Sequence, residues 1–140
     1  IIRTNVLEKN NLQEMVLVTS KNHSNKTLTN LIHRINFKKV ITMGSIGCKI
    51  ASILRGESDI YISLSPPGES SPKDWDFAAP EAILRAAGGS ITTLDNRELI
   101  YGKLNFAQGG IIIASNNAIN HKNVCLEIRE IIEKYAIYQV

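Results

Sequence analysis

Short apolar runs alternate along this chain with longer segments whose apolar residues recur at helical spacing, and this alternation limits the possible folds. The short runs, which are typical of β-strands, are 15–20, 38–43, 59–64, 90–94 and 110–115. The segments expected to hold helices are 23–37, 44–57, the stretch from 73 that stops at Gly88-Gly89, and 117–135. Strands alternating with helices predict an α/β fold with a layered, mostly parallel or mixed sheet flanked by helices. The chain has 140 residues, enough for a single α/β domain over 1–140 with its own core.

The apolar and cysteine content argues against two classes of protein. No apolar run approaches the roughly 20 residues that a membrane-spanning helix needs, and no signal-peptide pattern is found. Cys48 and Cys125 are far apart and match no metal-binding or redox spacing, so we expect two reduced thiols. The sequence therefore predicts a cytoplasmic protein without a membrane partner.

The basic residues are unevenly distributed, although the net charge is only +3. Seven of the sixteen lysines and arginines lie between Met15 and Gly56, and all thirteen aspartates and glutamates lie outside that stretch. Such a distribution favours an anionic partner, although a solvated basic surface is the simpler interpretation of charge alone. Phe37 is the only aromatic residue in the stretch, which argues against a stacking surface for a nucleic acid polymer.

Sheets of this kind bind ligands at the carboxyl ends of their strands, and three such ends are rich in polar residues. They are "TSKNHSNK", "TMGSIGCK" and "SLSPPGESSPKDWD". In "MGSIGCK", Ser45 precedes a helix and Lys49 lies about one turn into it, so helix N–H groups and one cation could hold a phosphate. The spacing is not that of a P-loop, and an ordinary capped helix whose lysine points into water is the alternative.

The loop "SKNHSNK" has a similar composition. His23 lies just before the expected helix, Ser24 or Asn25 is a candidate cap, and Lys26 falls in the first turn. A histidine or serine in this position can bind an anion together with the helix dipole, although a capped, exposed helix start is the simpler interpretation. The other two histidines, His33 and His121, are interpreted as structural residues of their helices.

The stretch "KDWDFAAPEA" combines a tryptophan and two carboxylates with residues too small to pack much. One carboxylate could simply cap the helix, but a cap needs neither Trp75 nor two alanines. Small side chains allow a ligand or another backbone to approach closely, and a carboxylate in an open cleft suits a hard cation such as Mg²⁺. Pro80 is expected near the first turn of the helix, where it is tolerated.

Three motifs in order together resemble the carboxyl-terminal half of the inositol monophosphatase superfamily of Mg²⁺-dependent phosphatases. "WDFAAPEAILRAAGG" is similar to the second signature of that superfamily, and "MGSIGCKIASILRGESDIYI" is similar to the segment before it. "SKNHSNK" is similar to the Ser-x-x-His-x-x-Lys loop of the 3′(2′),5′-bisphosphate nucleotidases, which the chain resembles most within the superfamily. The resemblance runs from about Thr19 to Asn117.

The resemblance implies the sugar phosphatase fold and hydrolysis of 3′-phosphoadenosine 5′-phosphate to AMP with Mg²⁺ as cofactor. By the same resemblance Asp76 is a metal ligand, and His23, Ser45 and Lys49 line the site for a nucleotide bisphosphate or another small phosphate ester. Trp75 is expected to pack beside the ligand. The alternatives are an inositol or sugar monophosphatase and, from another class, a non-catalytic nucleotide-binding module.

The sequence departs from the superfamily pattern in two respects. Ser63 stands where inositol phosphatases usually carry an acid and several nucleotidases carry arginine, which counts against an inositol phosphate substrate. The glutamate-rich segment and the Asp-Pro-x-Asp-Gly-Thr motif, which supply most metal ligands and the water-activating group, are not found. We therefore expect this chain to be the carboxyl-terminal half of a longer phosphatase, to hold no catalytic residue of its own, and to be inactive without its amino-terminal domain.

Overall fold

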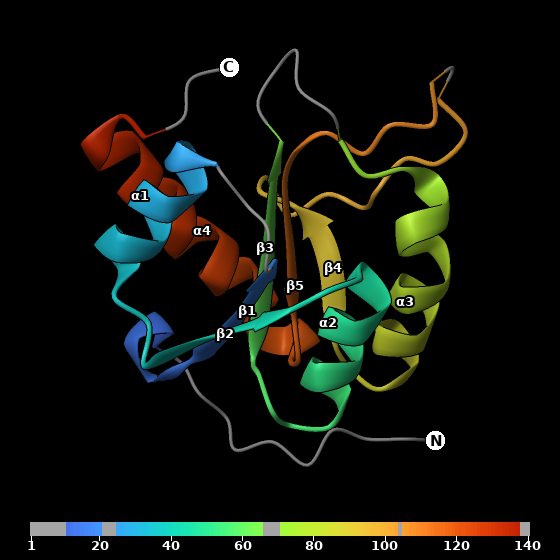
Figure 1. Cartoon of the computed structure of the whole chain (residues 1–140), viewed down its shortest axis with the longest axis horizontal. Helices are drawn as coiled ribbons and strands as arrows, with labels where there is room; N and C mark the ends of the chain where they lie inside the picture. The colour runs from blue at the N-terminus through green and yellow to red at the C-terminus, as the bar shows by residue number, and fades with distance from the viewer. Residues whose placement is uncertain (1–10, 21–24, 66–70, 104, 138–140) are drawn as a thin grey trace.

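The computed structural model describes residues 11–20, 25–65, 71–103 and 105–137, which form a five-stranded sheet with helices on both faces (Figure 1). The strands are β1 (Val16–Ser20), β2 (Lys39–Met43), β3 (Ile60–Ser65), β4 (Ser90–Thr93) and β5 (Gly110–Ser115). They lie in the order β2-β1-β3-β5-β4. β1 is parallel to β2 and β3, whereas β5 is antiparallel to both β3 and β4, so the sheet is mixed.

The helices form two layers. They are a short 3-10 helix η1 (Leu12–Glu14), α1 (Lys26–Ile35), α2 (Ile46–Leu54), α3 (Asp74–Ala86) and α4 (Ala118–Tyr135). α1 and α4 pack together on one face of the sheet, and α2 and α3 pack together on the other (Figure 1). Asn25, Ser45 and Asn117 cap α1, α2 and α4, because each side chain accepts a backbone N–H of the first turn. Within the described ranges, no helix is both long and apolar enough to cross a membrane.

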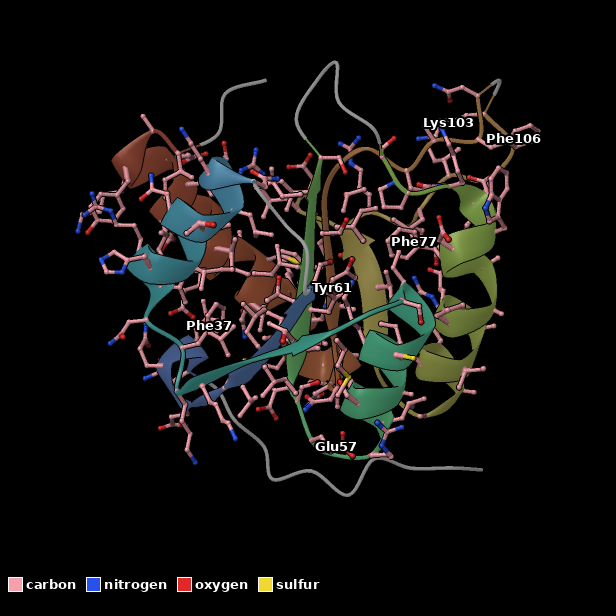
Figure 2. The ribbon with its side chains drawn as sticks, viewed as in Figure 1. Phe37, Glu57, Tyr61, Phe77, Lys103 and Phe106 are labelled. Atoms are coloured by element: carbon pink, nitrogen blue, oxygen red, sulfur yellow. The ribbon has the colours of Figure 1, made fainter. Side chains whose placement is uncertain are left out.

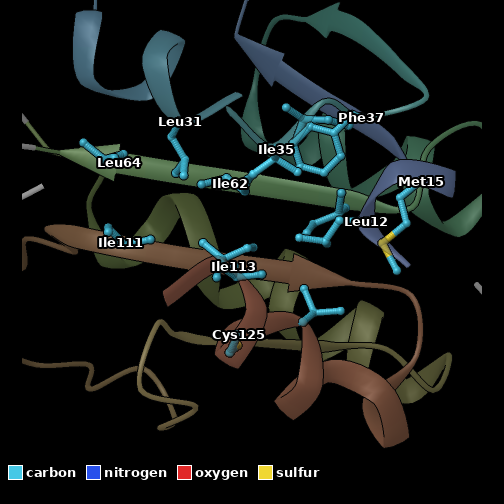
Figure 3. Close-up of a cluster of buried hydrophobic side chains, with 14 of the residues drawn as sticks. Leu12, Met15, Leu31, Ile35, Phe37, Ile62, Leu64, Ile111, Ile113 and Cys125 are labelled. Atoms are coloured by element: carbon cyan, nitrogen blue, oxygen red, sulfur yellow. The ribbon is translucent and has the colours of Figure 1, made fainter. Parts of the chain in front are cut away.

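Alternating side chains along the strands divide the buried residues into two cores. Leu17 and Ile62 belong to the core under α1 and α4, which Figure 3 shows together with Leu31 of α1. Val18 and Tyr61, their neighbours in sequence, belong to the core under α2 and α3. All six residues of β3 are buried, since this central strand is covered on both faces.

The structure confirms the fold class and the five strands, each of which begins and ends within one residue of the expected position. The first two helices are shorter than expected, for a backbone reason in each case. Asn36 adopts a left-handed conformation with φ of 60°, which ends α1 after Ile35. α2 ends at Leu54, and Gly56 reverses the chain with φ of 77°.

The start of α3 corrects one expectation. The helix already begins at Asp74, so Pro80 lies in the second turn and not near the first. Because proline has no N–H, the helical hydrogen bond from position 80 to the carbonyl of Asp76 is not made. Trp75 and both aspartates are therefore helical residues of the first turn, where negative charge is favourable to the helix dipole.

Candidate active site

The start of α2 lies at the carboxyl end of β2 and carries Ser45 and Lys49. Ser45 is the N-cap, and its Oγ accepts the backbone N–H of Cys48 at 3.1 Å. Lys49 is only 3% exposed, and its Nζ donates a hydrogen bond to Ser20 Oγ at 2.7 Å. The alternative that this lysine points into water is therefore wrong: the ammonium is held inside the α2 and α3 layer.

Tyr61 of β3 completes the surroundings of the lysine. The Lys49 ammonium lies 5.0 Å from the centre of the Tyr61 ring, a distance at which a cation is attracted by the aromatic face. Burial lowers the pKa of Lys49, because desolvation disfavours its charged form. Apart from Ser20 and Tyr61, no hydrogen-bond or ring partner of this ammonium lies within the described part of the chain. Its charge is therefore only partly compensated.

Tyr61 also connects the lysine to the start of α3. Burial raises the pKa of the Tyr61 hydroxyl, a hydrogen bond with Ser63 opposes this shift, and the negative charge of Asp76 adds to it. Phe77, the residue after Asp76, lies in the same buried cluster as Tyr61. Figure 2 shows Tyr61 on β3 in the middle of the molecule, facing the side that α2 and α3 cover.

The two aspartates at the start of α3 have different surroundings. Asp74 Oδ1 accepts a hydrogen bond from Gln108 Nε2 at 2.7 Å, and its Oδ2 accepts the backbone N–H of Gly102 at 2.8 Å. Both oxygens of Asp74 thus hold the segment 100–108 against the helix. In contrast, Asp76 accepts one bond, from the backbone N–H of Lys73 to its Oδ2 at 2.8 Å. Among the described residues no hydrogen bond is made to the other oxygen of Asp76, so Asp76 is the carboxylate free to bind a ligand.

A carboxylate oxygen fits a hard cation such as Mg²⁺, which prefers oxygen ligands. Asp76 meets this requirement as a single donor. However, no group of three or more histidine, cysteine, aspartate or glutamate side chains able to hold a metal is found among the described residues. The described part of the chain therefore offers one candidate metal ligand and not a complete metal site.

Trp75 lies on the outside of the same turn. It is 67% exposed, and its ring lies 6.3 Å from the ring of Phe106, centre to centre. Phe106 follows Lys103 in the segment that crosses the start of α3 (Figure 2). Its own backbone is left-handed, with φ of 55°, which is unusual for a bulky residue. The tryptophan thus forms part of an exposed apolar surface.

Of the residues expected to bind the substrate and the metal, the structure places Ser45 and Lys49 at the start of α2, and Asp76 at the start of the neighbouring α3. His23 lies outside the described residues. Ser20 was missed by sequence reasoning, although it is the first residue of "SKNHSNK". Its position on the same face of β1 as Val18 is the signal that could have found it.

His121 belongs to a separate polar network on the other side of the sheet, as a structural residue of α4. It is 1% exposed, and its two ring nitrogens form hydrogen bonds with Ser115 Oγ at 2.6 Å and Thr92 Oγ1 at 2.7 Å. Burial lowers the pKa of His121 to about 4, with a smaller contribution from the positive charge of Arg85. The ring is therefore neutral and structural at neutral pH.

Comparison with known proteins identifies the family of the chain. The model of the inositol monophosphatase family matches residues 3–133. The 3′(2′),5′-bisphosphate nucleotidase 1 of Rattus norvegicus is 34% identical over 104 residues, which are 73% of this chain and 32% of the relative. The 3′(2′),5′-bisphosphate nucleotidase CysQ of Buchnera aphidicola is 37% identical over 61% of this chain and 30% of its own length.

The chain is also similar in structure to solved proteins. The IMPase of Thermotoga maritima superposes with a TM-score of 0.67 at 26% identity, over 95% of this chain and 46% of that protein. Inositol monophosphatase II of Staphylococcus aureus gives a TM-score of 0.63 at 21% identity and supports the fold alone. The chain spans about a third of the length of the curated relatives described above and just under half of these structures.

Proposed function

The chain belongs to the inositol monophosphatase family, and from this premise we propose that it is the carboxyl-terminal half of a Mg²⁺-dependent phosphomonoesterase. The proposed reaction is hydrolysis of the 3′-phosphate of 3′-phosphoadenosine 5′-phosphate, which gives AMP and phosphate. The single observation that carries the proposal is the arrangement of Lys49 and Asp76, a buried cation and an available carboxylate near the starts of two helices that pack together.

Lys49 is the proposed phosphate-binding residue. A buried ammonium with a hydroxyl and an aromatic ring as its partners is stabilised by an added anion, because burial of an incompletely paired charge costs free energy. The N-terminus of α2 reinforces this preference, since its unpaired N–H groups and dipole attract negative charge. Ser45 holds the first turn of α2 through its bond to Cys48 and thereby fixes the position of these groups. His23 is proposed to contribute to the same anion site.

Asp76 is the proposed metal ligand of this half. A bound Mg²⁺ supplies electrostatic stabilisation of the charge that develops on the transferred phosphoryl group. The bond from Lys73 fixes one oxygen of the carboxylate and so orients the other. Tyr61 and Lys49 exclude water from the interior side of the site, since both side chains are almost fully buried. No residue of this half is proposed as the general base, which we assign, with the remaining metal ligands, to an amino-terminal domain.

A nucleotide bisphosphate is preferred over an inositol phosphate for two reasons. Ser63 is 6% exposed on β3 and interacts with the hydroxyl of Tyr61, so no acid is available there to bind sugar hydroxyls. In addition, the relatives at 34% and 37% identity are bisphosphate nucleotidases. An inositol or sugar monophosphatase is the second candidate, supported by the names of the similar structures, and a nucleotide-binding module without catalysis is the third. A cytoplasmic location is proposed because Cys48 and Cys125 are both free thiols.

The test is an assay of phosphate release by the intact protein with Mg²⁺, in which 3′-phosphoadenosine 5′-phosphate, inositol monophosphate and a sugar monophosphate are compared. We expect the highest kcat/KM for the nucleotide, and no turnover by the 140-residue chain alone. Faster hydrolysis of inositol monophosphate would favour the second candidate. Enzyme-like turnover by the chain alone would contradict the assignment of the general base to another domain.

A further inference from the structure

One hydrogen bond is missing from the helical ladder of α3, at the turn that carries Asp76. Proline has no N–H, so Pro80 cannot donate to the carbonyl of Asp76, which would be its helical partner. A proline ring also crowds the carbonyl four residues before it. The backbone of the candidate metal ligand is therefore connected to the following turn by one bond fewer than an ordinary helix provides.

The segment 100–108 attaches to α3 on the amino-terminal side of this missing bond. The carboxylate of Asp74 accepts the backbone N–H of Gly102 at 2.8 Å and the side-chain amide of Gln108 at 2.7 Å. The backbone N–H of Asp74 in turn donates to the carbonyl of Phe106 at 2.9 Å (Figure 2). These bonds hold the first turn of α3 from outside the helix.

The same segment attaches to α3 on the other side of the missing bond. The hydroxyl of Tyr101 donates to Glu81 Oε1 at 2.7 Å, and Glu81 is the residue that follows Pro80. Glu81 is 9% exposed, and its other oxygen accepts two bonds from the guanidinium of Arg85 at 3.1 and 3.2 Å. Burial, followed by the hydrogen bond and the charge of Glu81, raises the pKa of Tyr101, so its hydroxyl keeps its proton at neutral pH. Tyr101 therefore donates to a carboxylate that α3 itself holds in place.

We propose that Tyr101 is a positioning residue for Asp76. Tyr101 and Gly102 are neighbours in the chain, and their two bonds to α3 lie on either side of Pro80. This pair of contacts replaces, from outside the helix, the connection that Pro80 cannot make within it. The proposal rests on the proposed function, in which Asp76 is a metal ligand: Mg²⁺ demands near-ideal geometry, so a carboxylate ordered in advance binds it more tightly.

Hydrogen exchange of the intact protein, followed by mass spectrometry in EDTA and without substrate, measures the order of the first turn. Tyr101→Phe removes the hydroxyl and keeps the ring. We expect exchange of the peptide 73–79 to become about tenfold faster, as the loss of one hydrogen bond to a charged group allows. Peptides from β3 and α1 should exchange at an unchanged rate. Tyr135→Phe, on α4 at the other face of the sheet, is the matched control and should alter none of these peptides.

Pro80→Ala separates positioning from a general effect on stability. Alanine restores the N–H donor that the carbonyl of Asp76 lacks, so the first turn should no longer depend on Tyr101. In the Pro80→Ala background, Tyr101→Phe should therefore leave the exchange of 73–79 almost unchanged. If Tyr101 only stabilised the segment 100–108, Pro80→Ala would give no such rescue.

Metal binding is the second readout. Calorimetric titration of the intact protein with Mg²⁺ alone should show about threefold weaker binding for Tyr101→Phe, because a carboxylate ordered only part of the time binds with an affinity reduced by that fraction. In the phosphate-release assay, the Mg²⁺ concentration for half-maximal activity should rise by the same factor. The KM for the nucleotide at saturating Mg²⁺ should not change, since the variant leaves Lys49 and its partners intact.

Three results would overturn the proposal. They are exchange of 73–79 that Tyr101→Phe leaves unaltered, faster exchange that Pro80→Ala does not correct, and an unchanged affinity for Mg²⁺ despite faster exchange. The proposed function is judged separately, because exchange and metal binding require no turnover. The expected exchange and metal binding without phosphate release would refute the function alone, and hydrolysis of the nucleotide with unaltered exchange in Tyr101→Phe would refute the positioning role alone.

Discussion

The two sides of the sheet differ in what they bury. The core under α1 and α4 is formed by leucine, isoleucine and other apolar residues from both helices, η1 and the strands (Figure 3). The core under α2 and α3 is smaller, and it surrounds the buried polar groups Lys49 and Tyr61. The first side also buries His121, whose two ring nitrogens are both hydrogen-bonded, whereas the second side buries an ammonium with one hydrogen bond. We propose that the incompletely paired charge on the second side marks a binding site and lowers stability there. The predictions below test this division.

The largest effect is expected from Leu31→Ala on the α1 and α4 side. Leu31 is fully buried, and a cavity of this kind lowers the free energy of unfolding by about 4 kcal/mol. Urea unfolding of the chain measures the change. In the intact protein, the specific activity of the molecules that remain folded should not change. If activity per folded molecule fell as well, stability on one side of the sheet and activity on the other side would not be independent.

The next largest effect is expected in the pH dependence of stability, through His121 on the same α1 and α4 side of the sheet. Its pKa is about 4 in the folded chain and near 6.5 when unfolded, so the unfolded state binds the proton more tightly. The stabilisation is complete above pH 6.5 and is lost as the pH falls towards 4, in total about 3 kcal/mol. Urea unfolding at several pH values measures this loss. His121→Gln should make the free energy of unfolding less dependent on pH over this range. An unchanged slope would show that the pH dependence comes from other groups.

On the other side, Asp76→Asn in the intact protein should lower kcat about 100-fold, because the neutral amide binds Mg²⁺ weakly. The bond from Lys73 can still be accepted by the amide oxygen, so the unfolding temperature should change little. Asp74→Asn is the contrasting variant, since it weakens the attachment of the segment 100–108 and should affect stability first. Full activity of Asp76→Asn would remove Asp76 from the metal site.

The smallest effect is expected from Lys49→Met, which should raise KM for the nucleotide about tenfold through loss of one charged contact. The chain itself should become no less stable, because a buried ammonium is replaced by an apolar side chain of similar length. Lys122→Met, at an exposed position on α4, is the matched control for both measurements. An unchanged KM for Lys49→Met would contradict its role in phosphate binding.

Much of the fold could be predicted because it depends on local periodicity. The five strands are short apolar runs bounded by polar loops, and each was located within one residue. The end of α1 could not be located, because it depends on the left-handed backbone of Asn36, which is a residue that also occurs inside helices. The start of α3 was misplaced because Pro80 is usually a first-turn residue, whereas here the helix tolerates it one turn later.

The sequence pointed to residues at two neighbouring helix starts, but it could not supply their surroundings. The sequence could not decide whether Lys49 is exposed, since that depends on Ser20 and Tyr61, which lie on other strands. Nor could it separate the structural roles of Asp74 and Asp76 on physical grounds, because the partners of Asp74 lie about thirty residues further along the chain. The roles of His23, Ser45, Lys49 and Asp76 in binding stay predictions that the variants above can test.

The attachment of Asp74 to Gly102 and Gln108 has a consequence for the order in which the molecule is made. During synthesis, α2, β3 and α3 are translated before the segment that fixes the mouth of α3. β5 and α4 are translated only after that segment, and β5 lies between β3 and β4 in the sheet. The mouth of α3 can therefore be attached before the sheet is complete.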